Sequence, residues 1–128
     1  MRSDLLLKLA DGLENYVKDE WWTYTYTFTD GFDKQKCGSL ACAIGWSVPL
    51  MGDPRLQFSK NGYLQLDGED TWDIDIMSKY YNIPINDANA IFSEAKTYDK
   101  YWNDVTRLDV AAKIREYVAS DGKLFENT

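Results

Sequence analysis

The chain has 128 residues and a mass of 14.8 kDa, which is the size of one domain around one hydrophobic core. Hydrophobic residues make up 45% and charged residues 27% of the chain, a composition that is typical of globular proteins and excludes an intrinsically disordered one. The net charge of -7 argues against direct binding of nucleic acid by a general basic surface, and the absence of histidine excludes Ser-His-Asp triads, HExxH zinc sites and histidine pH switches.

The N-terminal residues and the cysteines indicate a cytoplasmic protein. Asp4 and Lys8 interrupt the apolar centre that a signal peptide needs, so we expect no secretion. The longest apolar stretch, residues 40–51, is far shorter than the ~20 residues that span a bilayer, which argues against a membrane protein. Cys37 and Cys42 are too few for a disulfide framework, and we expect both to be reduced and buried.

The first half of the chain predicts a helix, a strand and a second helix. From Asp4 to about Asp19, apolar residues follow the 3-4 spacing of one helical stripe. Residues 22–29 alternate aromatic side chains with threonine, which is the period-two pattern of a strand. The dense apolar segment that follows predicts a buried helix with Ser39 as its N-cap and an end before Pro49.

A hairpin is predicted next, over residues 56–66. Asn61-Gly62 readily takes the positive φ angles of a type I′ turn between two apolar strands. An isolated hairpin is marginal in water, so the strand over 22–29 is its natural third partner.

The spacing of apolar residues predicts three more helices after the hairpin. The first carries Trp72 in its apolar stripe and continues to Tyr81, and the second follows Pro84. A capping-box variant at Thr106 opens the last helix, which ends before Gly122, and we expect the final six residues to fray. The sequence therefore predicts one α+β domain over 1–128, with a small antiparallel sheet (strand plus hairpin) packed against about five helices.

An acidic segment is the first candidate for function. It holds five carboxylates within nine residues, without a compensating Lys or Arg inside it. Its spacing fails the EF-hand pattern, so calcium binding is disfavoured. Two interpretations stay open: Asp70 and Asp73 cap and begin a helix, or the segment forms a recognition surface that competes for a basic groove on another protein. The acidic residues are Asp67, Glu69, Asp70, Asp73 and Asp75.

Surplus aromatic side chains are the second candidate. At 15% of the chain, aromatic residues are too many for one small core, so some should be exposed. Tyr98, Tyr101 and Trp102 lie in a loop-like stretch and are candidate anchors for a protein partner. The alternative is a loop that folds back over the core.

Two further sequence patterns give only weak evidence for a function. Residues 75–91 follow helix-turn-helix spacing, but Asp87 and Glu94 would repel phosphates, so two packed core helices are the better interpretation. Cys37 lies near Lys34 and Lys36, which would lower its pKa, but no histidine is present to serve as its base. We predict no catalytic residues, no metal site and no cofactor.

The run Cys37-Gly-Ser-Leu-Ala-Cys42-Ala-Ile-Gly45-Trp46 resembles a Cys-Gly-Ser/Thr-x-Ala-Cys-x-x-Gly element of small, uncharacterised phage and bacterial proteins. Those proteins also begin with a leucine-rich helix and end with helices similar to those over 83–92 and 106–118. The resemblance implies a phage or mobile-element origin. In size and charge the chain is comparable with anti-CRISPR and anti-restriction proteins.

Together these features predict a non-enzymatic acidic protein, phage-derived and DNA-mimicking, that blocks a nucleic-acid-binding site on a host protein in the host cytoplasm. The partner would be a CRISPR or restriction component with a basic groove; direct nucleic-acid and membrane binding are not expected, and a homodimer stays open. The alternative is a small-ligand or nucleotide-binding, sponge-like protein with an aromatic pocket between sheet and helices. An enzyme would have to work through carboxylates alone.

Overall fold

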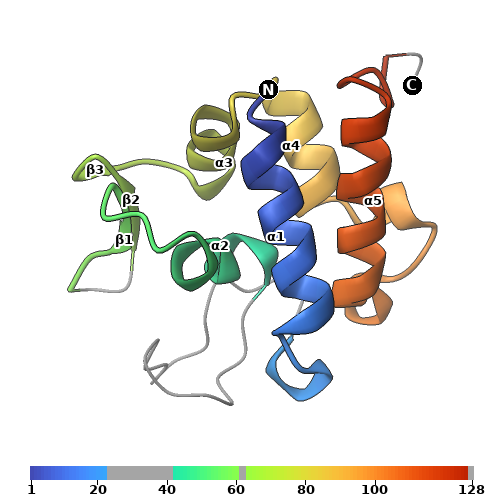
Figure 1. Ribbon diagram of the computed structural model, residues 1–128, viewed down its shortest axis with the longest axis horizontal. Helices are drawn as coiled ribbons and strands as arrows, with labels where there is room; N and C mark the ends of the chain where they lie inside the picture. Colours follow the sequence, from blue (N-terminus) through green and yellow to red (C-terminus); the bar gives the residue numbers. More distant parts are fainter. Residues whose placement is uncertain (23–41, 61–62, 127–128) are drawn as a thin grey trace.

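A computed structural model describes residues 1–22, 42–60 and 63–126, and it confirms the α+β class (Figure 1). Within these residues, five α-helices accompany one three-stranded antiparallel sheet and three short 3-10 helices. The α-helices are α1 (Ser3–Asn15), α2 (Ala43–Met51), α3 (Asp73–Tyr81), α4 (Ile85–Phe92) and α5 (Arg107–Ala119). The strands are β1 (Leu56–Phe58), β2 (Leu64–Leu66) and β3 (Glu69–Asp70), and the 3-10 helices are η1 (Asp19–Trp21), η2 (Ala95–Tyr98) and η3 (Trp102–Asp104).

Helix α1 is central, packed against α5 along its length and against α2 near its C-terminus (Figure 1). Its predicted apolar stripe is buried, with Leu6, Leu9 and Leu13 fully covered. The helix ends at Asn15 rather than near Asp19. The Arg107 guanidinium donates to the Leu13 and Glu14 carbonyl oxygens at 2.7 and 2.9 Å, which satisfies the open end of the helix.

The predicted capping box of α5 is confirmed. The Thr106 hydroxyl accepts from the Asp109 N–H at 3.1 Å, and the Asp109 carboxylate accepts from the Thr106 N–H at 3.0 Å. After α5 the chain differs from the expected fraying, because Leu124 and Phe125 pack on the core and the Phe125 ring stacks on Tyr117 at 5.7 Å.

The predicted hairpin is confirmed, with Leu56 opposite Leu66 and Phe58 opposite Leu64. Its turn at 61–62 lies outside the described residues. The described third strand is β3, which pairs with β2. Apart from Trp22, the strand predicted over 22–29 lies outside the described residues, so it stays a prediction.

Helix α2 differs from the expectation at both ends. Cys42 occupies the N-cap position, and Pro49 lies inside the helix instead of stopping it. The helix continues to Met51, and Gly52 ends it at a φ of 61°, in the left-handed region that glycine adopts easily. Proline only removes one N–H here, and it is exposed while the rest of the helix packs on the core. Ser39 lies outside the described residues.

Helices α3 and α4 form the predicted pair. Asn82 ends α3 at a φ of 53°, and Pro84 is the N-cap of α4. The buried residues of the pair include Ile76, Tyr80 and Tyr81 from α3 and Ile91 from α4. In the part of the chain that the structure describes, no helix has the length and apolar character needed to cross a bilayer.

Candidate protein-binding surfaces

The acidic segment forms one end of the molecule. It leaves β2 at Asp67, continues through β3 and enters the first turn of α3 (Figure 1). We call its side chains Glu69, Asp70, Trp72, Asp73 and Asp75 the acidic face.

Asp67 is already paired within the fold. Arg55, just before β1, donates to its two carboxylate oxygens at 2.8 and 3.2 Å. These hydrogen bonds lower the pKa of Asp67 and raise that of Arg55. The cation lies twelve residues away in the sequence, just before the neighbouring strand, which is why the segment looked uncompensated. Asp67 is therefore ion-paired within the fold, although its side chain is about half exposed.

Asp70 does not cap α3, which corrects one interpretation of the segment. It lies in β3 and accepts from the Gln65 amide at 2.5 Å, while Trp72 occupies the N-cap position. Asp73 and Asp75 lie in the first turn of α3, where the positive end of the helix dipole favours carboxylates. In the described part of the chain, Glu69, Asp70 and Asp75 form no ion pair.

Trp72 is the main residue that sequence reasoning misplaced. We predicted it in the apolar stripe of a helix, but its side chain is 82% exposed at the N-cap of α3. Tyr63 on the hairpin is also exposed. The signal for Trp72 was its acidic surroundings, since core aromatic residues are seldom flanked by carboxylates on both sides.

The loop from η2 to η3 holds the predicted aromatic anchors, and the structure separates them. Tyr98 packs partly buried on the core, and its hydroxyl donates to the Ile91 carbonyl at 2.8 Å, so it follows the folded-back alternative. Tyr101 is 81% exposed and Trp102 is 49% exposed. Of the three predicted anchors, only Tyr101 and Trp102 expose enough of their side chains for a partner to contact.

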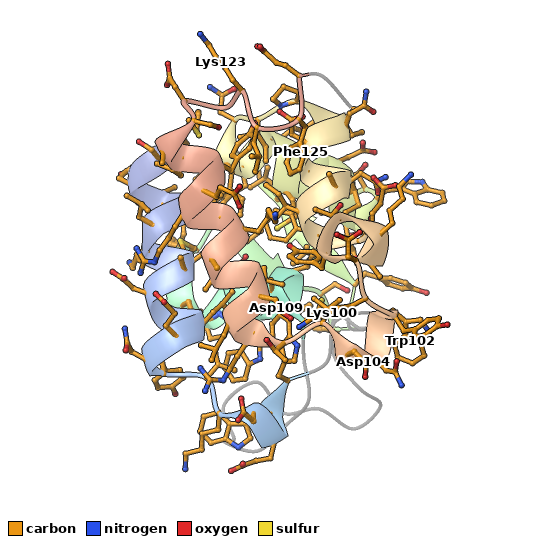
Figure 2. The ribbon with its side chains drawn as sticks, turned by 90° about the vertical axis from the view of Figure 1, so that its right-hand side faces the viewer. Lys100, Trp102, Asp104, Asp109, Lys123 and Phe125 are labelled. Atoms are coloured by element: carbon orange, nitrogen blue, oxygen red, sulfur yellow. The ribbon has the colours of Figure 1, made fainter. Side chains whose placement is uncertain are left out.

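The two predicted surfaces lie at opposite ends of the molecule. Figure 1 places the sheet and the acidic face beyond α2 and α3, while the loop around η3 lies beyond α5 on the other side. Figure 2 looks onto this second end, with α5 in front, Trp102 and Asp104 at the lower right edge and the sheet behind. One flat partner surface cannot contact both ends at once.

One of the two cysteines, Cys42, lies in the described core. Cys42 is buried with a free thiol, and burial raises its pKa to about 11, which disfavours the reactive thiolate. Cys37 lies outside the described residues. Within residues 1–22, 42–60 and 63–126, no group of three or more Cys, Asp or Glu side chains is arranged to hold a metal ion.

Several grooves lie on the helical side of the molecule, beside α4, η2 and α5. The largest of those described has a volume of about 920 Å³ and lies between α4, η2 and the C-terminal residues. Its walls include Asn86, Asn89, Lys96, Lys113 and Phe125.

No protein-family model, no curated protein and no solved structure matches this chain. The resemblance to small phage and bacterial proteins therefore stays a prediction, and the function is argued from the surfaces themselves.

Proposed function

We propose that the protein is a non-enzymatic binding protein whose acidic face occupies a basic, nucleic-acid-binding site on a host protein. The observation that carries this proposal is Trp72, 82% exposed between Asp70 and Asp73. A large exposed indole is typical of interface anchors, because its burial on binding gives much of the binding free energy.

The surroundings of Trp72 define the chemistry of the partner. Glu69, Asp70 and Asp75 have no ion pair in the described part of the chain, so they are available to cations on another molecule. A site that binds nucleic acid combines Lys and Arg with apolar or aromatic side chains that stack on bases. Carboxylates that neighbour an exposed indole in the chain offer negative charge and a flat ring to the same side chains, and should therefore compete with the nucleic acid.

The host and compartment in this proposal come from the resemblance at Cys37 to Trp46. A phage-derived acidic inhibitor would act in the host cytoplasm, and a CRISPR or restriction component is the target we favour. Its effect would be to evade host defence by excluding nucleic acid from the target.

Affinity capture followed by displacement tests the proposal. The wild-type chain is immobilised, host lysate is applied, and bound proteins are eluted with a salt gradient and identified by mass spectrometry. We expect a nucleic-acid-binding protein that is released by moderate salt, because screening weakens exposed charge pairs. Purified, that protein should release labelled nucleic acid when the wild-type chain is added.

Two variants assign the binding to the acidic face. Trp72→Ala should weaken binding by at least about 30-fold, the effect of losing an interface anchor. The combined change Glu69→Gln, Asp70→Asn, Asp73→Asn and Asp75→Asn should weaken it by on the order of tenfold or more. The charge-matched control changes four exposed carboxylates elsewhere: Asp4→Asn, Glu20→Gln, Asp121→Asn and Glu126→Gln. Equal binding by all variants, or a captured protein that keeps its nucleic acid, would contradict the proposal.

The groove beside α4 favours a second candidate, a small-ligand or nucleotide-binding protein. The amides of Asn86 and Asn89, the ammonium groups of Lys96 and Lys113 and the Phe125 ring could contact a polar, flat ligand. A thermal-shift screen separates the two candidates, since ligand at a hundred times its Kd adds about 2.7 kcal/mol of stability. If no nucleotide or metabolite moves the midpoint, the second candidate is wrong.

A further inference from the structure

The loop at the far end from the acidic face exposes apolar surface that the fold does not cover. On this loop Tyr101 is 81% exposed and Trp102 is 49% exposed. Exposed aromatic side chains gathered on one loop are typical of an interaction site.

Two contacts hold the loop on the N-terminal side of Tyr101. The Lys100 ammonium contacts the Asp109 carboxylate at 2.7 Å, and Asp109 in turn belongs to the capping box of α5. Figure 2 shows Lys100 and Asp109 together beside α5, with Trp102 at the edge of the molecule. At its beginning, Tyr98 is bonded to Ile91. Contacts of this kind reduce the conformational entropy that a loop loses when a partner binds.

The charges around Tyr101 select the partner. Tyr101 lines a hollow of about 540 Å³ together with Asp99, Asp104, Lys96 and Lys100. Both lysines are already engaged, Lys96 with Glu94 at 3.2 Å and Lys100 with Asp109. Asp99 and Asp104 are exposed and have no ion pair within the described residues. The free charge of the hollow is therefore negative.

We infer that this loop is a second docking surface and that its occupant is an arginine-bearing segment of a protein partner. A guanidinium group stacks on an exposed aromatic ring and donates to two carboxylates in one plane, which matches Tyr101 with Asp99 and Asp104. Because the loop and the acidic face are at opposite ends (Figures 1 and 2), the two surfaces act independently. The inference goes beyond the proposed function and does not require it.

An NMR titration tests this inference with the acidic face removed. The full chain carrying Glu69→Gln, Asp70→Asn, Asp73→Asn and Asp75→Asn is labelled with ¹⁵N and titrated with a short peptide of alternating glycine and arginine. We expect saturable shifts of the amides over 98–104 and of the Trp102 indole N–H. Adding Asp99→Asn and Asp104→Asn should weaken binding by about fivefold or more, whereas Asp4→Asn and Asp121→Asn, with the same charge change, should leave it unchanged.

Peptides that differ only at the arginine positions test whether the guanidinium group is what the loop recognises. A peptide with citrulline in place of arginine should not bind, and one with lysine should bind more weakly, because an ammonium group cannot stack and fork in the same way. The inference is overturned if the lysine peptide binds equally well, if the shifts survive the loss of Asp99 and Asp104, or if the loop signals depend on protein concentration without peptide, which would indicate a second copy as the occupant. The NMR titration does not depend on the displacement assay described above, so one proposal can be wrong while the other is right.

Discussion

Ser47 and Tyr81 form the most enclosed polar contact of the described core. Both side chains are fully buried, their hydroxyl oxygens lie 2.7 Å apart, and the Ser47 hydroxyl donates to the Ala43 carbonyl at 2.9 Å. Burial raises the pKa of Tyr81, so its hydroxyl stays protonated and can donate to Ser47. The pair joins α2 to α3 through one directional contact.

Removing the two hydroxyls should have unequal effects. Ser47→Ala leaves the buried Tyr81 hydroxyl without its partner, so the free energy of unfolding should fall by about 1–3 kcal/mol. Tyr81→Phe leaves Ser47 bonded to Ala43, and the loss should be smaller, about 0.5–1.5 kcal/mol. Urea unfolding of both variants measures the difference, and a larger loss for Tyr81→Phe would contradict this reading of the contact.

The elements show which sequence signals determine structure. The 3-4 spacing of leucines in α1, the capping box at Thr106 and the apolar residues of the β1–β2 hairpin act locally, so they predicted their elements correctly. Pro49 was misleading, because packing of α2 on the core outweighs the hydrogen bond that proline removes. Trp72 was misplaced, and the two alternatives for Tyr98 could not be separated from the sequence, because exposure depends on contacts between distant segments that periodicity does not contain.

Pro49 therefore makes α2 less stable than it would be with a residue that has a backbone N–H. Pro49→Ala restores a backbone N–H that can donate to the Gly45 carbonyl four residues earlier, in an exposed position. The helix gain is partly offset by the greater entropy of the unfolded chain, so we expect a net stabilisation of about 1–2 kcal/mol.

Thermal and urea unfolding of Pro49→Ala measure that gain. Pro54→Ala, which changes a proline in the turn before β1, is the matched control and should give no stabilisation. If Pro49→Ala is destabilising, the ring of Pro49 contributes contacts that its exposure does not indicate.

The stability of the whole molecule should depend on pH through carboxylates that accept hydrogen bonds in the fold. The Arg55 N–H donates to Asp53 at 3.0 Å and the Tyr80 hydroxyl donates to it at 3.1 Å, and both bonds lower the pKa of Asp53. Burial raises the pKa of Asp109, but the hydrogen bonds from Lys100 and Thr106 together outweigh it and lower the pKa. In the unfolded chain an aspartate has a pKa of about 3.9.

A lowered pKa in the folded state means that these carboxylates stabilise the fold above pH ~4 and that the stabilisation is lost as pH falls through their folded pKa values. Urea unfolding from pH 7 down to pH ~3 should show this loss. Asp53→Asn should make the decline shallower, and Asp4→Asn provides the same charge change at an exposed position. An equal pH dependence in wild type and Asp53→Asn would contradict the role of Asp53.

Strand β3 has a consequence beyond binding. Among the described residues it is an edge strand of the sheet, only two residues long, and both residues are exposed carboxylates. Any chain that added a strand there would have to approach Glu69 and Asp70, and a second copy of β3 would bring like charges together. The negative charge to which we assign partner binding thus also protects the sheet from edge-to-edge aggregation, so a substitution of Glu69 or Asp70 should change both binding and solubility.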